Sequence, residues 1–286
     1  MKGFHPILRE MERYSNIVLL LECILSLFYC LERAFSTIIS PMRIGIYGLG
    51  RFGTFFASTL RRGGAEVIAY SRSAHEVPEG VRLATEDEVL NADYLVFTVT
   101  ISAFESVLKS VSSRIGRNTV VIDTCSVKTM PAKWMEAELP DYIYRIATHP
   151  MFGPDSGRNG VEGLPIVMCE LSKRDERYDE LKRYFECLGL KVLEMSPREH
   201  DQEAAYSQGV THFVGRVLDN MGMKPTEIAT KGYRSLMEIV EQTCNDPVEL
   251  FYDLQRYNPY AREMRLSLQV SIERILNRLA EEEDRK

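Results

Sequence analysis

The sequence lacks the cysteine patterns of secreted or zinc-binding proteins. Its six cysteines form no C-x-x-C pair and no cluster with the five histidines. Disulfide scaffolds and metal sites are therefore not expected, and we predict reduced cysteines of a cytosolic enzyme. An excess of positive charge is also missing, because the net charge is −6. This balance argues against a nucleic-acid-binding protein.

Long hydrophobic runs are absent as well. The segment Ile17–Cys30 is apolar but interrupted by Glu22, and it is too short to span a bilayer. No small-residue cleavage site follows it, and the four glutamates of the first 32 residues are atypical of a transit peptide. We therefore predict that residues 1–41 are an N-terminal extension of unknown role, that Met42 is a plausible functional start, and that the protein is cytoplasmic and has no membrane partner.

A glycine-rich segment is the most informative part of the chain. Gly48, Gly50 and Gly53 have G-x-G-x-x-G spacing, directly after the strand-like run Arg43–Tyr47 and at the start of a helical pattern that ends at Gly63. In this context the first glycine allows a tight turn, the second lets the backbone approach a pyrophosphate, and the third lets helix and strand pack closely. The helix start adds free N–H groups and a positive dipole end. The residues of this loop predicted to bind a dinucleotide are Gly48, Leu49, Gly50, Arg51, Phe52 and Gly53.

The end of the second predicted strand, Glu66–Tyr70, indicates which dinucleotide is bound. An NAD site typically has Asp or Glu there, whereas this chain has Ser71, Arg72 and Ser73. A guanidinium and hydroxyl groups would receive a 2′-phosphate that a carboxylate would repel. We therefore predict NADP, with NAD possible. The predicted cofactor site also includes Thr98, Val99 and Thr100, at the end of a later strand.

Strands and helices alternate from Met42 to about Met195, and only helical patterns follow. The further predicted strands are Val81–Ala84, Asp93–Val99, Asn118–Asp123, Tyr142–Ala147, Leu164–Cys169 and Leu190–Met195. The helices between them are Thr85–Asn91, Ala103–Ile115, Lys133–Leu139 and Asp175–Leu188, and the later ones are Pro197–Met221, Thr226–Cys244, Pro247–Tyr257 and Pro259–Arg285. We predict an α/β Rossmann-type, doubly wound, mostly parallel sheet over residues 42–195. An all-helical substrate and dimerisation domain over residues 196–286 would complete a homodimer.

His149 and Ser126 are the predicted catalytic residues. Each follows a predicted strand at the edge of the sheet where the cofactor is expected. Prolines and glycines around His149 predict a rigid loop, which suits a histidine used in chemistry. Ser126 could donate to the same substrate oxygen, or it could cap the helix that follows Lys128.

Two more histidines lie on one predicted helix. His200 and His212 are 12 residues apart, a little over three turns, so both can point toward one face. His200 beside Asp201 could be an ordered pair behind the site, and His212 could meet an anionic substrate. A metal is not expected, because no i, i+4 histidine pair accompanies them.

Four motifs together resemble the TyrA family of prephenate and arogenate dehydrogenases, most closely the short plant-type arogenate dehydrogenases. They are DTCSVK from Asp123, THPMFGPDSGRNG from Thr148, EMSPREHDQEAAYSQGVTHFVGR from Glu194 and TKGYRSLMEIVEQT from Thr230. The resemblance covers about Met42 to Leu276. It implies oxidative decarboxylation of a cyclohexadienol acid in tyrosine biosynthesis.

The resemblance also implies residue roles. His149 would accept a hydrogen bond or the proton from the ring C4 hydroxyl, and Ser126 would bind the same hydroxyl. His212 and Gln208 would lie in the substrate pocket, and His200 is included in the predicted substrate site. Many bacterial members hold a substrate carboxylate with an arginine, where this chain offers Met237 or Glu238. Lys231 and Arg234 are the predicted substitutes for this arginine.

Asp246 is the predicted determinant of substrate choice. Arogenate carries an ammonium where prephenate carries a ketone, so a nearby carboxylate should favour arogenate. The alternative role for Asp246 is an N-cap of the helix from Pro247 onward. Two other functions stay open from the residues alone: another Rossmann-plus-helical oxidoreductase of the β-hydroxyacid dehydrogenase or imine reductase type, and a non-catalytic NADP-binding sensor.

Overall fold

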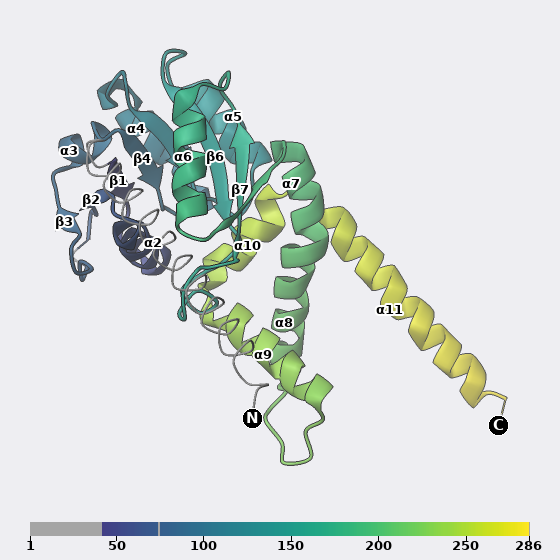
Figure 1. Ribbon diagram of the computed structural model, residues 1–286. Helices are drawn as coiled ribbons and strands as arrows, with labels where there is room; N and C mark the ends of the chain where they lie inside the picture. Colours follow the sequence, from purple (N-terminus) through teal and green to yellow (C-terminus); the bar gives the residue numbers. More distant parts are fainter. Residues whose placement is uncertain (1–41, 74, 286) are drawn as a thin grey trace, which may run out of the picture. The chain divides into compact units, whose positions relative to one another are not determined.

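The computed structural model of the protein (Figure 1) describes residues 42–73 and 75–285. Residues Arg43–Lys286 form one compact unit. The predictions for residues 1–41 lie outside the described residues.

One eight-stranded sheet organises the N-terminal part of this unit. Its strands stand in the order β3-β2-β1-β4-β5-β6-β7-β8. They are β1 (Arg43–Tyr47), β2 (Glu66–Tyr70), β3 (Arg82–Leu83), β4 (Tyr94–Phe97), β5 (Val120–Asp123), β6 (Tyr144–Pro150), β7 (Pro165–Glu170) and β8 (Lys191–Glu194). All neighbours pair in parallel except β6 and β7, which are antiparallel. The predicted α/β class with a mostly parallel, doubly wound sheet is therefore confirmed.

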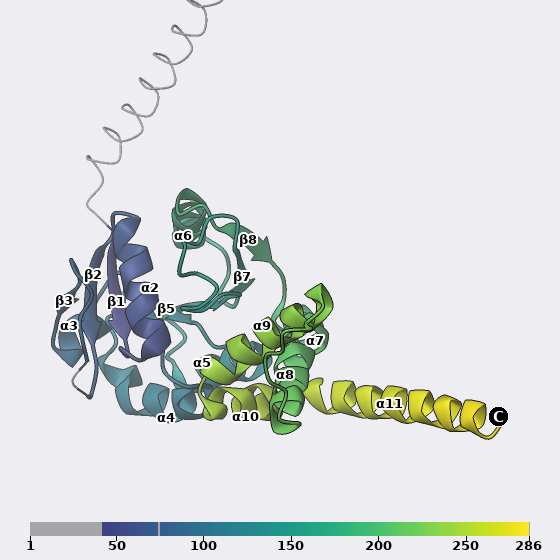
Figure 2. The same ribbon diagram turned by 90° about the horizontal axis from the view of Figure 1, so that it is seen from below.

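Helices cover both faces of the sheet (Figure 2). On one face lie α2 (Arg51–Arg62) and α6 (Glu176–Cys187), joined where the Tyr184 hydroxyl donates to the carbonyl of Leu60. On the other face lie α3 (Glu86–Leu90), α4 (Ile101–Val111) with the short η1 (Ser112–Arg114), and α5 (Thr129–Glu138). The predicted cap Thr85 forms a capping box with Glu88 at the start of α3.

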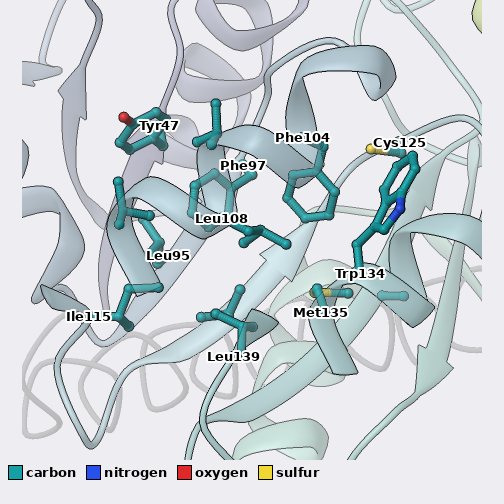
Figure 3. Close-up of a cluster of buried hydrophobic side chains, with 14 of the residues drawn as sticks. Tyr47, Leu95, Phe97, Phe104, Leu108, Ile115, Cys125, Trp134, Met135 and Leu139 are labelled. Carbon is teal, nitrogen blue, oxygen red and sulfur yellow. The ribbon is translucent and has the colours of Figure 1, made fainter. Parts of the chain in front are cut away.

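The core on the α4–α5 face fixes these helices against the strands (Figure 3). Phe97 of β4 packs edge-on against Phe104 of α4, with 5.5 Å between ring centroids. Phe104 in turn contacts Trp134 of α5, at 6.4 Å. The rings of Phe97 and Phe104 are at most 1% exposed. Burying such a side chain contributes about 1.5–3 kcal/mol, so this layer holds the ends of β4 and β5 in place.

Residues beyond the sheet form helices. They are α7 (Pro197–Ala204), the π turn η2 (Ala205–Gly209), α8 (Val210–Asn220), α9 (Lys231–Asn245), α10 (Val248–Tyr257) and α11 (Ala261–Glu283). Helix α9 begins five residues later than predicted, because the Thr230 side chain caps it by accepting from Tyr233 N at 3.1 Å. Among the described residues no helix is long and apolar enough to cross a bilayer.

The environment of His149 differs from the prediction in one respect. His149 lies inside β6 and not in a loop after it, because β7 returns antiparallel and its Val167 pairs with His149. The backbone of the expected loop is thus held by ladder hydrogen bonds through Pro150.

Candidate active site

The glycine loop has the geometry that a dinucleotide phosphate needs. Gly48 has φ +115°, a conformation that favours glycine, and its N–H donates to Tyr70 O at 2.8 Å. A Cβ on Gly53 would lie 2.1 Å from Gly48 O, so helix α2 packs directly on the loop. A Cβ on Gly50 would meet nothing within 4 Å. The loop is therefore tight on its protein side and open at Gly50, which fits a pyrophosphate at the start of α2.

Neighbouring strand ends support this loop. Thr98, just after β4, donates from its hydroxyl to Gly48 O at 2.6 Å. Thr100 is the N-cap of α4 and uses no side-chain cap. Arg72 follows β2 and is exposed. Burial would raise the pKa of the nearby Glu86 carboxylate, and the charge of Arg72 is one of the interactions that lower it. The Thr98 hydroxyl thus supports the glycine loop through a hydrogen bond, while Arg72 lies exposed at the end of β2.

Beneath the next strand ends lies a buried ion pair. Lys128 and Asp123 are both fully buried, and the Lys128 ammonium donates to the Asp123 carboxylate and to Thr148 O. Burial raises the pKa of Asp123, and the Lys128 ammonium opposes this change. The pair joins the end of β5 to the end of β6, directly before His149.

His149 belongs to a chain of hydrogen bonds that reaches into the helical region. His149 Nδ1 lies 2.8 Å from His200 Nε2, and His200 Nδ1 lies 2.9 Å from Asp201 Oδ1. The carboxylate of Asp201 also accepts from the backbone N–H groups of Lys128, at 2.7 Å, and Thr129, at 2.8 Å. Although burial opposes the ionised form, these hydrogen bonds lower the pKa of Asp201.

The chain of hydrogen bonds determines the tautomers of the His149 and His200 rings. An ionised Asp201 can only accept, so His200 carries its proton on Nδ1 and leaves Nε2 as an acceptor. His149 then donates from Nδ1, and its Nε2 accepts no hydrogen bond from residues 42–73 and 75–285. Burial, together with the neighbouring His200 and Lys128, lowers the pKa of His149 well below its usual value. The imidazole of His149 is therefore neutral at neutral pH and can accept a hydrogen bond, and its lowered pKa makes it a weaker base than an ordinary histidine.

Ser126 follows β5, the strand that pairs with the strand carrying His149. Asp123 of β5 pairs in parallel with Ala147 of β6. Ser126, three residues after Asp123, and His149, two residues after Ala147 and still within β6, therefore lie toward the same edge of the sheet. The alternative of Ser126 as a helix cap is wrong, because the N-cap position of α5 is Lys128. The carboxylate of Asp201 binds the first amides of α5 in place of a cap.

His212 and Gln208 lie on the same continuous helix as His200. His212 is buried, and burial together with the nearby Arg216 lowers its pKa to about 4. Gln208 is half-buried, one turn earlier. Both nitrogens of His200 are occupied by His149 and Asp201, so His200 orients the imidazole and has no nitrogen free for substrate.

Asp246 connects the helical region with the glycine loop. Arg51 donates from one guanidinium nitrogen to Asp246 Oδ1 at 3.0 Å and from another to Asp155 Oδ1 at 2.6 Å. The alternative of Asp246 as an N-cap is wrong, because Pro247 holds that position and Asp246 ends α9 instead. Burial raises the pKa of Asp246, and Arg51 opposes this change.

The two predicted carboxylate-binding cations of α9 lie elsewhere. Lys231 and Arg234 are exposed in its first turn, and Arg234 donates to Ala229 O at 2.7 Å. The rise of an α-helix places this turn roughly 20 Å from Asp246. Within the described part of one chain they do not join the site.

The predicted pairing of His200 with Asp201 is found in the structure, but its link to His149 and to the first amides of α5 was not predicted. Sequence reasoning also missed the role of Lys128. The burial of Lys128 had no signal in the sequence, because lysine is usually exposed.

Comparisons with known proteins find two matching family models and several relatives. Residues 56–194 match the prephenate dehydrogenase nucleotide-binding domain, and residues 217–286 match the TYRAAT1-like C-terminal domain. The chain is 38% identical over 252 residues to arogenate dehydrogenase 2, chloroplastic, of Arabidopsis thaliana, covering 84% of this chain and 70% of that protein. It is 36% identical to arogenate dehydrogenase 1, chloroplastic, of the same plant, of which it spans 39%.

Two solved structures share the fold. The prephenate dehydrogenase from A. aeolicus, in complex with hydroxyphenyl propionate and NAD+, superposes with a TM-score of 0.65 at 22% identity, covering 86% of this chain and 94% of that one. The Synechocystis arogenate dehydrogenase superposes with a TM-score of 0.62 at 21% identity, covering 85% and 93%.

Proposed function

Since the chain belongs to the family of prephenate and arogenate dehydrogenases, we propose that it catalyses the NADP-dependent oxidative decarboxylation of arogenate, with prephenate as the alternative substrate. The observation that carries this proposal is the free Nε2 of a neutral His149, held by His200 and Asp201 at the edge of the sheet where the glycine loop opens.

His149 and Ser126 would act on the substrate's C4 hydroxyl. His149 Nε2 accepts the hydrogen bond or the proton of this hydroxyl, and Ser126 donates to the same oxygen. Asp201, through His200, stabilises the imidazolium and fixes the ring orientation. A proton held on His149 returns to the phenol oxygen once the ring is aromatic.

The cofactor supplies the oxidant. A bound, oxidised nicotinamide would supply the acceptor for the hydride of C4, and carbon dioxide would leave from the opposite ring carbon. The chain's part is to hold the dinucleotide through Gly48, Gly50 and Gly53 and the N–H groups of the first turn of α2. Arg72 with Ser71 and Ser73 supports NADP over NAD, because the end of β2 carries no carboxylate.

Asp246 would recognise the ammonium of arogenate. Its carboxylate is free of any capping role and partly buried, where an attraction between charges is less screened. Replacing Asp246 by Asn is expected to reduce kcat/KM for arogenate while leaving prephenate turnover near the wild-type level. An unchanged ratio of the two activities would refute this role.

One assay tests the activity. Protein, NADP and either arogenate or prephenate are mixed, and the absorbance of the reduced cofactor is followed. His149→Asn keeps a polar side chain but removes the accepting nitrogen, so turnover should fall by about 100- to 10,000-fold with NADP affinity unchanged. His75→Asn, at an exposed position, is the matched control. A wild-type protein that reduces no NADP with either substrate would overturn the proposal.

A homodimer through the helical region is part of the proposal. Helix α11 exposes a set of apolar side chains that includes Leu266, Val270, Ile272, Ile275, Leu276 and Leu279. Such a face is commonly buried against a second copy. Leu276→Glu should shift the molar mass measured by light scattering from dimer to monomer. The cytoplasmic location stays a prediction, and two relatives carry the description chloroplastic.

A further inference from the structure

Three buried polar atoms on one face of the helix formed by α7, η2 and α8 have no hydrogen-bond partner within the described part of the chain. They are Gln208 Oε1, His212 Nδ1 and Arg216 Nε. Their spacing of four residues stacks them along one side of the helix, which continues the line from His200. His212 itself is 6% exposed. Buried polar groups are normally satisfied, so a row of three indicates the place of a polar ligand.

Arg216 is distinguished from the other cations of the site by its partners. Lys128 is paired with Asp123, and Arg51 is shared between Asp155 and Asp246. The guanidinium of Arg216 bonds only to main-chain carbonyls, those of Thr243 at 3.1 Å and Asp246 at 2.8 Å. Over residues 42–73 and 75–285 it makes no ion pair, although its charge opposes the rise that burial causes in the pKa of the nearby Asp246. The half-buried guanidinium can therefore still bind an anion.

The close packing of α8 on α9 brings Arg216 to this position. A Cβ on Gly215 would lie 2.1 Å from the Thr243 hydroxyl, so only glycine lets the two helices approach this closely. The last turn of α9 therefore lies against Arg216, and Asp246 follows at its end. The guanidinium of Arg216 and the carboxylate of Asp246 thus lie next to each other, at the end of the row that is remote from His200. The Asp246 carboxylate can bind a ligand in addition to Arg51.

We propose that Arg216 and Asp246 together bind the zwitterionic head of an α-amino acid, with the α-carboxylate on Arg216 and the α-ammonium on Asp246. This inference rests on the proposed function and extends it, because it specifies the substrate as an amino acid with both charges recognised. The row from Arg216 through His212 and Gln208 runs along one side of the helix from this head-group site toward His200. Arg216 takes the role that sequence reasoning gave to Lys231 or Arg234.

Three ligands separate the two charges. L-Tyrosine, the aromatic product expected from arogenate, carries both charges; 3-(4-hydroxyphenyl)propionate carries only the carboxylate, and tyramine only the ammonium. Their dissociation constants are measured by calorimetry on the NADP-loaded protein. Arg216→Gln should weaken L-tyrosine and the propionate by about 10- to 100-fold, the range of a charge-assisted hydrogen bond, and leave tyramine unchanged. Asp246→Asn should weaken L-tyrosine and tyramine and leave the propionate unchanged.

Two further variants test whether the changes in the dissociation constants are specific to the guanidinium of Arg216. Arg198→Gln removes an exposed arginine from the same helix and should change no constant. Arg216→Lys keeps the charge without the planar fork, so it should give an intermediate loss for the two carboxylates only, and it serves if Arg216→Gln does not fold.

An equal loss for all three ligands, no loss, or failure of all three to bind the wild-type protein would overturn the proposal. Absence of NADP reduction with both substrates would instead reject the proposed function, while the ligand pattern would still report on the site.

Discussion

The buried, neutral His212 makes the stability of the fold depend on pH in a calculable way. Its pKa in the folded protein is about 4, against 6.5 for an unperturbed histidine. Below about pH 6.5 the unfolded chain takes up a proton on His212 that the folded protein excludes until about pH 4. This contribution to stability is therefore complete above pH 6.5 and is lost as the pH falls.

The two pKa values set the size of the effect. Between pH 7 and pH 5, His212 should lower the free energy of unfolding by about 2 kcal/mol, and by about 3 kcal/mol once the pH falls below 4. His149 acts in the same direction, because burial lowers its pKa also.

Urea unfolding of wild type and His212→Asn at pH 7, 6 and 5 measures this contribution. The carboxylates titrate in both proteins, so the difference between the two slopes isolates His212. The variant should lose about 2 kcal/mol less than wild type on going from pH 7 to pH 5. His75→Asn, at an exposed position, should follow wild type. Identical pH dependence of wild type and His212→Asn would refute the reasoning, because His212 would then be protonated as readily in the folded protein as in the unfolded chain.

Three further perturbations test other parts of the structure. Gly53→Ala should lower the free energy of unfolding by about 1–3 kcal/mol, because the new Cβ meets Gly48 O. Gly50→Ala should leave the free energy of unfolding within about 1 kcal/mol of wild type and weaken NADP binding. Thermal melts measure the stability of both variants, and cofactor titration measures their NADP binding. Lys128→Met should cost about 3–5 kcal/mol in urea unfolding, because Asp123 is left buried without its counter-charge, and a loss under 1 kcal/mol would contradict this. Arg72→Gln should raise the KM for NADP while leaving that for NAD unchanged; parallel changes would remove the case for 2′-phosphate recognition.

Local patterns in the sequence predicted the parts of the fold that depend on neighbouring residues. The glycine spacing gave the turn before α2, and Thr85 gave the capping box of α3, because both are decided within a few residues. The rule that parallel strand ends share one edge also agrees with the pairing of Asp123 in β5 with Ala147 in β6, and the proximity of Ser126 to His149 stays a prediction.

Contacts between distant segments could not be predicted in this way. His149 meets His200 only because α7 packs beside α5, and helical periodicity does not say which neighbour a helix chooses. His149 lies within a strand because β7 pairs antiparallel with β6, and this pairing of two strands cannot be predicted from the residues near His149. Arg51 and Asp246 are 195 residues apart, and nothing local to either residue indicates the other.

Asp201 is a fixed joint between the sheet and the helices. Its side chain holds the first amides of α5 and the ring of His200, while Asn258 donates to its carbonyl at 2.8 Å. Arg216 lies 15 residues further along the helix, roughly 20 Å from Asp201 along the helix axis. A rotation of the helices about Asp201 would hardly move the two imidazoles, whereas it would displace Asp246 and break its ion pair with Arg51 of the glycine loop.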